Sequence, residues 1–131
     1  MAGSSYLEMN NCHINGVFVG CNGLGVITLL GTSSLKMTNT TIQKTFIRGS
    51  SSKSAGIYLD DSGTSAELYN CTFKDLITTD NSGKEYYAHW GGAIKCYGRL
   101  YCNGCNFINC VTDMFGFQNS LLNNNLLIIQ I

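Results

Sequence analysis

The chain carries little charge and has no excess of either sign. Only 12% of its residues are charged, and Lys plus Arg equal Asp plus Glu in number. The sequence therefore offers no basic surface that would attract nucleic acid or an anionic membrane. It also contains no run of about 18 apolar residues, which argues against a membrane-spanning helix.

Proline is absent, whereas glycine occurs 15 times. Asn, Ser, Thr and Gly dominate the polar residues, and β-branched and aromatic residues dominate the apolar ones. This balance favours strands and turns over helices. The length suits one domain with a real core, so we expect a single all-β domain over residues 1–131.

A degenerate repeat runs through the sequence. Four segments of similar pattern align without gaps, and their first residues are Leu7, Leu35, Ala66 and Leu100. A weaker fifth segment begins at Leu121. The segments follow one another at intervals of roughly 30 residues, which suits a solenoid in which each repeat forms one coil.

Each repeat has signals for three short strands. The first strand alternates apolar and polar residues, and the second carries the apolar positions Ile14, Ile42, Phe73 and Phe107. The third strand is marked by Gly25-Val26-Ile27, Gly56-Ile57-Tyr58 and Gly92-Ala93-Ile94, with Gly116-Phe117 as a candidate fourth instance. The sequence thus predicts a single-stranded parallel β-helix of about four to five coils. We expect it to be a segment of a longer solenoid, with 118–131 as an incomplete last coil or a cap.

Stacking of the coils turns equivalent positions into columns. Two inward columns are predicted, namely Leu7, Leu35, Ala66 and Leu100, and Met9, Met37, Leu68 and Cys102. On the outside, Lys36 would lie between Glu8 and Glu67.

A ladder of asparagines is predicted at the bend after the first strand. Asn11, Asn39 and Asn70 occupy this position, where stacked amides can bond to one another, and Gly104 interrupts the ladder. Asn39 and Asn70 also begin N-glycosylation sequons. Because we expect the ladder side chains to point inward, we predict that neither asparagine carries a glycan.

Two motifs carry a resemblance to a known family. Asn70-Cys71-Thr72-Phe73 and Gly91-Gly92-Ala93-Ile94 resemble repeats of pectin-lyase-like right-handed β-helix proteins, and similar units occur in polymorphic outer-membrane adhesins and protist surface proteins. The resemblance covers roughly residues 5–117. It implies right-handed coils and an extracellular or cell-surface location, although the N-terminal MAGSSYLEMNN lacks the pattern of a signal peptide. The fold itself carries lyases, hydrolases, adhesins and structural proteins.

The seven cysteines include a pair with metal-ligand spacing, Cys102-x-x-Cys105. The repeat places Cys102 in a core column, however, so we expect neither a metal site nor a cofactor. Cys71 and Cys105 would lie on adjacent coils about 4.8 Å apart, within the Cα separation that a disulfide permits. We expect reduced, stacked thiols, with a Cys71–Cys105 disulfide as the alternative.

The connector 78–90 is the predicted ligand-binding segment. It contains Asp80, Tyr86, Tyr87, His89 and the only tryptophan, Trp90. Aromatic faces beside carboxylate and amide groups suit a polysaccharide, another glycan or a cell-surface protein. The alternative is that these aromatic residues fold back against the flank of the coil.

Catalysis has weaker support in the sequence. Asp60 and Asp61 are adjacent in a turn and should diverge, whereas glycosidases need two carboxyl groups that converge on the substrate. The sequence therefore favours a non-enzymatic surface, adhesive or structural segment. Two alternatives stay open: a fragment or degenerate relative of a polysaccharide lyase or hydrolase, and a building block that associates end to end through open coil ends.

Overall fold

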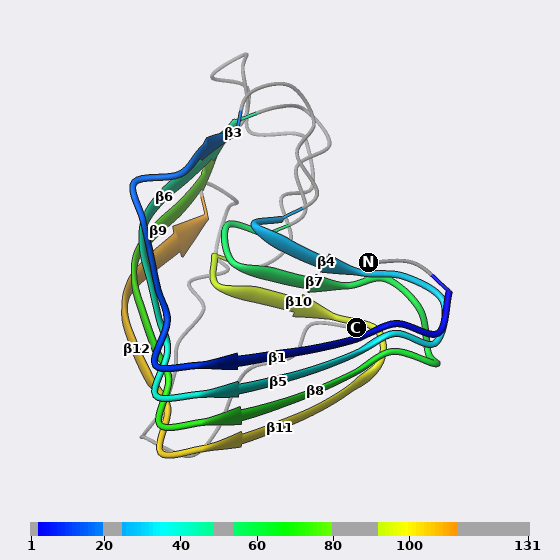
Figure 1. The fold of residues 1–131 in the computed structure, drawn as a ribbon. Helices are drawn as coiled ribbons and strands as arrows, with labels where there is room; N and C mark the ends of the chain where they lie inside the picture. Colours follow the sequence, from blue (N-terminus) through cyan, green and yellow to red (C-terminus); the bar gives the residue numbers. More distant parts are fainter. Residues whose placement is uncertain (1–2, 20–24, 49–53, 80–91, 113–131) are drawn as a thin grey trace.

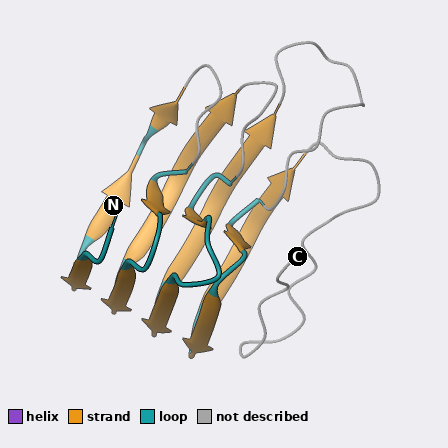
Figure 2. Ribbon diagram, turned by 90° about the vertical axis from the view of Figure 1, so that its right-hand side faces the viewer, coloured by secondary structure: helices purple, strands orange, loops and turns teal. Residues whose placement is uncertain are grey.

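The computed structural model describes residues 3–19, 25–48, 54–79 and 92–112, and these residues form twelve β-strands and no helix. The strands belong to three sheets, which we name A, B and C (Figure 1). The first three repeats each run through sheet A, then B, then C, and the fourth supplies strands to A and B. Figure 2 shows the strands of adjacent repeats side by side.

All strand pairs in the three sheets are parallel. Sheet A consists of β1 (Tyr6–Asn10), β5 (Ser34–Thr38), β8 (Ser65–Tyr69) and β11 (Arg99–Asn103). Sheet B consists of β2 (His13–Asn15), β6 (Thr41–Arg48), β9 (Thr72–Thr79) and β12 (Asn106–Thr112), with β3 (Phe18–Val19) paired to β6. Sheet C consists of β4 (Ile27–Leu29), β7 (Ile57–Leu59) and β10 (Ile94–Cys96). This all-β arrangement is compatible with the predicted parallel β-helix.

The register in sheets A and B confirms the columns predicted from the repeat. Leu35 pairs with Leu7 and Ala66, and Ala66 pairs with Leu100. Two further columns pair in the same way, namely Met9, Met37, Leu68 and Cys102, and Ile14, Ile42, Phe73 and Phe107. The inward side chains form one core between the sheets, and its fully buried members include Leu29, Met37, Ile42, Leu59, Leu68 and Phe73.

Sheet C departs from the register that its glycines suggest. Alignment of Gly25, Gly56 and Gly92 would place Tyr58 opposite Ile27 and Ile94. The ladder instead pairs Ile57 with both Ile27 and Ile94. A shift of one residue exchanges the two faces of a strand, and this register is the one that places all three isoleucines in the core.

The bend between sheets A and B has left-handed backbone in every repeat. The residues at the bend have φ values of 55°, 49°, 52° and 66° for Asn11, Asn39, Asn70 and Gly104, respectively. Asparagine and glycine adopt this conformation with less steric strain than other residues. The predicted ladder positions are therefore the positions at which the chain turns a corner.

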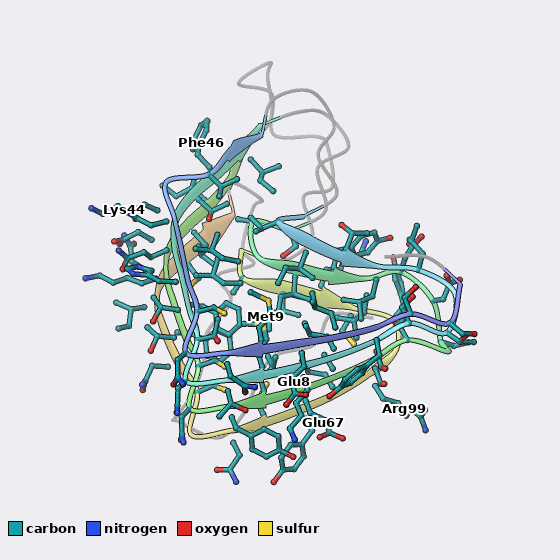
Figure 3. All side chains as sticks on the ribbon, viewed as in Figure 1. Glu8, Met9, Lys44, Phe46, Glu67 and Arg99 are labelled. Atoms are coloured by element: carbon teal, nitrogen blue, oxygen red, sulfur yellow. The ribbon has the colours of Figure 1, made fainter. Side chains whose placement is uncertain are left out.

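A second left-handed column, which the sequence did not indicate, bends sheet B along its length. It consists of Gly16 (φ 73°), Lys44 (φ 52°), Asp75 (φ 53°) and Asn109 (φ 51°). Asn109 Nδ2 donates a hydrogen bond of 2.8 Å to Asp75 Oδ1 across adjacent repeats. Lys44 points away from the core (Figure 3).

Three parts of the prediction fall outside the described residues. These are the segment that starts at Leu121, the last coil or cap at 118–131 and the Gly116-Phe117 motif. The single domain over 1–131 stays a prediction. Within the described ranges, no helix has the length and apolar character needed to cross a bilayer.

Candidate functional site

The outer face of sheet A carries the largest set of exposed aromatic and charged side chains on one described sheet. Side chains alternate between the two faces of a strand, so each strand of this sheet contributes to the core and to the surface. We call the outward set the sheet A face, and it includes Tyr6, Glu8, Lys36, Glu67, Tyr69, Arg99 and Tyr101. Glu8, Glu67 and Arg99 lie on this side of the molecule in Figure 3.

Tyrosines give the sheet A face its apolar area. Tyr6 is 61% exposed and Tyr101 is 51% exposed. The ring of Tyr101 lies 5.6 Å from the ring of Tyr69, with the two planes tilted by 51°. Each ring combines a flat apolar surface with a polar hydroxyl group, which suits a contact that is partly wet.

The two carboxylates of the face are held by tyrosine hydroxyls on their own strands. Glu8 accepts hydrogen bonds from Tyr6 Oη at 3.4 Å and from Asn10 Nδ2 at 3.3 Å. Glu67 accepts one from Tyr69 Oη at 3.2 Å. Partial desolvation and then the neighbouring glutamate raise the pKa of both Tyr6 and Tyr69 above the ordinary value. The phenols therefore stay protonated at neutral pH and act as donors to the carboxylates.

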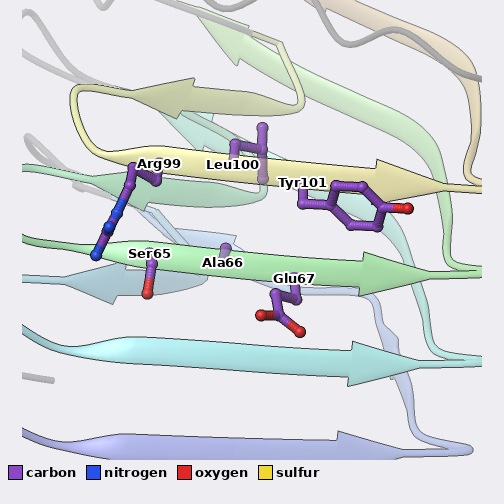
Figure 4. A pocket seen from close by; sticks show the side chains of 6 residues that line it. All are labelled: Ser65, Ala66, Glu67, Arg99, Leu100 and Tyr101. Carbon is purple, nitrogen blue, oxygen red and sulfur yellow. The ribbon is translucent and has the colours of Figure 1, made fainter.

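Two open depressions lie side by side on this face. The first, of about 360 Å³, is lined by Ser65, Ala66, Glu67, Arg99, Leu100 and Tyr101 (Figure 4). The second, of about 380 Å³, is lined by Tyr6, Ser34, Leu35, Lys36, Ser65 and Glu67. They share Ser65 and Glu67, and each adds one tyrosine and one cationic side chain. In Figure 4, Arg99 extends from β11 toward Ser65 on β8.

The sequence predicts ligand-binding residues in the 78–90 connector. All five of them lie outside the described residues, namely Asp80, Tyr86, Tyr87, His89 and Trp90. Their role in ligand binding stays a prediction.

The asparagine ladder faces outward, so its predicted inward orientation is wrong. Asn39 Nδ2 donates a hydrogen bond of 3.3 Å to Asn11 Oδ1, but Asn11, Asn39 and Asn70 are all exposed. Left-handed backbone at the corner turns these side chains to the surface, and the next residue of each repeat points into the core instead. Those inward residues are Cys12, Thr40, Cys71 and Cys105. Burial therefore does not protect Asn39 and Asn70 from glycosylation.

Cys71 and Cys105 are buried, free thiols on adjacent repeats. Asn106 N donates to Cys71 O at 2.8 Å, which brings the backbones of the two cysteines together. Hydrogen bonding to Cys105, and then burial, raises the pKa of the Cys71 thiol. Within the described ranges, no group of three or more His, Cys, Asp or Glu side chains is placed to hold a metal ion.

Asp60 and Asp61 have separate structural roles. Asp60 accepts a hydrogen bond from the Tyr58 hydroxyl, while Asp61 Oδ2 accepts one of 2.6 Å from the backbone N–H of Gly31 in the preceding repeat. The side chains thus have different partners, as expected for adjacent residues of a turn.

The sheet A face was not among the predicted functional residues, although its signal is present in the sequence. The alternation in the first strand of each repeat separates outward from inward positions. The outward positions taken alone place tyrosines and opposite charges on one surface. Comparison of the chain with protein-family models, curated proteins and solved structures found no match.

Proposed function

We propose that this chain is a segment of a right-handed, pectin-lyase-like β-helix that acts outside the cell as a non-enzymatic binding module for glycans. The sheet A face is the contact surface, and the 78–90 connector is a second candidate contact. The observation that carries the proposal is the exposure of Tyr6 and Tyr101 on a sheet face that also presents oriented carboxylates. Exposed aromatic side chains beside polar groups are typical of binding surfaces.

The chemistry of this face matches that of a sugar. Tyrosine rings can stack against the C–H groups of a pyranose, while Glu8 and Glu67 accept hydrogen bonds from its hydroxyl groups. Lys36 and Arg99 can donate to ring and hydroxyl oxygens. Two glutamates and two cations cancel in charge on this face, which favours an uncharged glycan over a strongly acidic one.

Binding of neutral oligosaccharides, measured by a glycan array and then by calorimetry, tests the proposal. We expect the Tyr6→Ala/Tyr101→Ala double variant to bind at least about tenfold more weakly than the unaltered chain, which corresponds to roughly 1.4 kcal/mol. Ile108→Ala is the matched control, because Ile108 is 47% exposed and lies on sheet B. Circular dichroism of all three proteins checks that the fold is retained.

Two results would contradict this function. Equal affinity of the double variant and the control would remove the sheet A face as the contact surface. Release of shorter products from a polysaccharide incubated with the chain would identify a polysaccharide-cleaving enzyme instead.

A further inference from the structure

Three cysteines lie where sheets A and B join in the last two described repeats. Cys102 occupies an inward position of β11 opposite Leu68, and Cys105 follows it across the Asn103-Gly104 corner. Cys71 occupies the position equivalent to Cys105 in the preceding repeat. The three thiols thus come from two neighbouring repeats and point toward the same part of the core.

Cys105 is the central thiol of the three. Hydrogen bonding to the Cys102 side chain is the main cause that raises the pKa of Cys105, and the Cys105 side chain also interacts with Cys71. Cys105 Sγ lies 3.5 Å from Leu68 O, which confirms that it points toward the preceding repeat. Because Leu68 is the register partner of Cys102, Cys105 lies between Cys102 of its own repeat and Cys71 of the preceding repeat. We refer to Cys102, Cys105 and Cys71, in this order, as the series.

Access to solvent falls along this series. Cys102 is partly exposed, whereas Cys105 is 2% exposed and Cys71 is fully buried. A dissolved oxidant can reach Cys102 first. The two buried thiols can react with it only through Cys102 or by opening of the fold.

We propose that Cys102, Cys105 and Cys71 form a thiol–disulfide relay that passes oxidation from the surface into the core. The co-reactant is a low-molecular-weight disulfide such as oxidised glutathione. The end product is a Cys71–Cys105 disulfide that links the third and fourth repeats. This inference does not depend on glycan binding by the sheet A face.

Each step of the relay is an ordinary thiol–disulfide exchange. The Cys102 thiolate attacks oxidised glutathione, forms a mixed disulfide and releases one glutathione thiolate. The Cys105 sulfur then attacks the Cys102 sulfur while the Cys105 proton passes to the departing glutathione thiolate, which forms the Cys102–Cys105 disulfide and releases the second glutathione as a thiol. Finally, the Cys71 sulfur attacks the Cys105 sulfur while the Cys71 proton passes to the departing Cys102 sulfur, which forms Cys71–Cys105 and returns Cys102 to a thiol. Two thiols lose two electrons overall, and these electrons reduce one glutathione disulfide to two thiols.

The last step is geometrically permitted. Equivalent residues on adjacent parallel strands have Cα atoms about 4.8 Å apart, within the range of disulfides. Cys12 occupies the same column but lies two repeats from Cys71, about twice that distance, so it cannot take the place of Cys105.

The sequence offers a direct measurement of the product. Trypsin leaves Cys71 in peptide 54–74, and it leaves Cys102, Cys105 and Cys110 together in peptide 100–131. After treatment of the full chain with oxidised glutathione and trapping of free thiols by alkylation, we expect the two peptides to be joined. Fragmentation in the mass spectrometer should place the bond at Cys105, with Cys102 alkylated. A time course should show glutathione on Cys102 before the peptides become joined.

Single serine variants separate the steps. In Cys102→Ser, the two peptides should become joined at least tenfold more slowly. Oxidation of Cys71→Ser should stop at the Cys102–Cys105 disulfide, and oxidation of Cys105→Ser should stop at the mixed disulfide of Cys102 with glutathione. Cys96→Ser is the control, because this buried cysteine lies on sheet C outside the series, and it should oxidise like the unaltered chain.

Several results would overturn the relay. One is that the two tryptic peptides become joined in Cys102→Ser at the same rate as in the unaltered chain. Another is a final disulfide between Cys71 and either Cys102 or Cys110. The time course on the unaltered chain tests the order of events even if a variant fails to fold. In that experiment, stable glutathione on Cys102 without joined peptides would also rule out the relay.

Discussion

The rings of Phe73 and Phe107 stack in parallel, with centroids 4.8 Å apart and planes within 6° of each other. They pair in register on β9 and β12, and Ile42 pairs with Phe73 on the opposite side. Phe73 thus lies between two apolar neighbours of its own column, which explains its complete burial. One column therefore contributes both to the core and to the alignment of the repeats.

Truncation of the enclosed ring should be strongly destabilising. We expect Phe73→Ala to lower the free energy of unfolding by about 3–5 kcal/mol, because a cavity would form between Ile42 and Phe107. Phe107→Ala should have a smaller effect, since Phe107 is only partly buried. Denaturant unfolding followed by circular dichroism measures both values, and equal losses would contradict the stacking argument.

Two buried threonines should respond in opposite directions to the same substitution. Among the described residues, Thr45 Oγ1 is the buried side-chain oxygen without a hydrogen-bond partner. Thr45→Val removes this unpaired group and should raise the free energy of unfolding by about 1 kcal/mol.

Thr40→Val is the matched comparison. Thr40 Oγ1 accepts a hydrogen bond from Cys12 N at 3.3 Å and donates one of 3.0 Å to Thr38 O. Loss of this hydroxyl group should lower the free energy of unfolding by about 1–2 kcal/mol. Denaturation midpoints that move in the same direction for both variants would refute this prediction.

The corner residue Asn39 should tolerate glycine better than alanine. Its φ of 49° is unfavourable for a residue with a Cβ atom. Asn39→Ala should therefore lower the free energy of unfolding by about 1–2 kcal/mol. Asn39→Gly also loses the hydrogen bond to Asn11 but avoids the backbone strain, so its loss should be smaller. Thermal unfolding of the two variants measures both losses. Identical losses would show that the side-chain ladder, and not the backbone conformation, determines the contribution of Asn39 to stability.

Gly98 should not accept a side chain. A Cβ atom at this position would overlap the backbone oxygen and the hydroxyl of Thr64, and the same backbone oxygen accepts a hydrogen bond from Arg99 N at 2.9 Å. We expect Gly98→Ala to lower the free energy of unfolding by about 2–3 kcal/mol, because the backbone itself must move.

Gly16→Ala provides the comparison for that overlap. Gly16 has a φ of 73°, but a Cβ atom at this position would have no neighbour within 4 Å, so only backbone strain of about 1 kcal/mol applies. Urea denaturation of the two variants gives the difference. A larger loss for Gly16→Ala would show that overlap at Gly98 is relieved without cost.

The columns of sheets A and B could be predicted because one face of each strand is buried and the other is not. The pattern of β5, in which Leu35 and Met37 are buried between less buried neighbours, is visible as alternation in the sequence. In sheet C, β7 and β10 lack this signal, since all three residues of each strand are buried. Alignment of the three glycines would therefore offset β7 by one residue from the register that the sheet adopts.

The sequence by itself determined the repeat, the parallel pairing of its strands and the inward columns, because these depend on a local period and on equivalent positions. Tertiary structure decided which way the corner asparagines point, since that depends on the sign of φ at Asn11, Asn39 and Asn70. It also decided the grouping of outward residues into the sheet A face and the meeting of Cys71, Cys102 and Cys105. These groupings join residues that are distant in the chain, and only the stacking of repeats brings them within reach of one another.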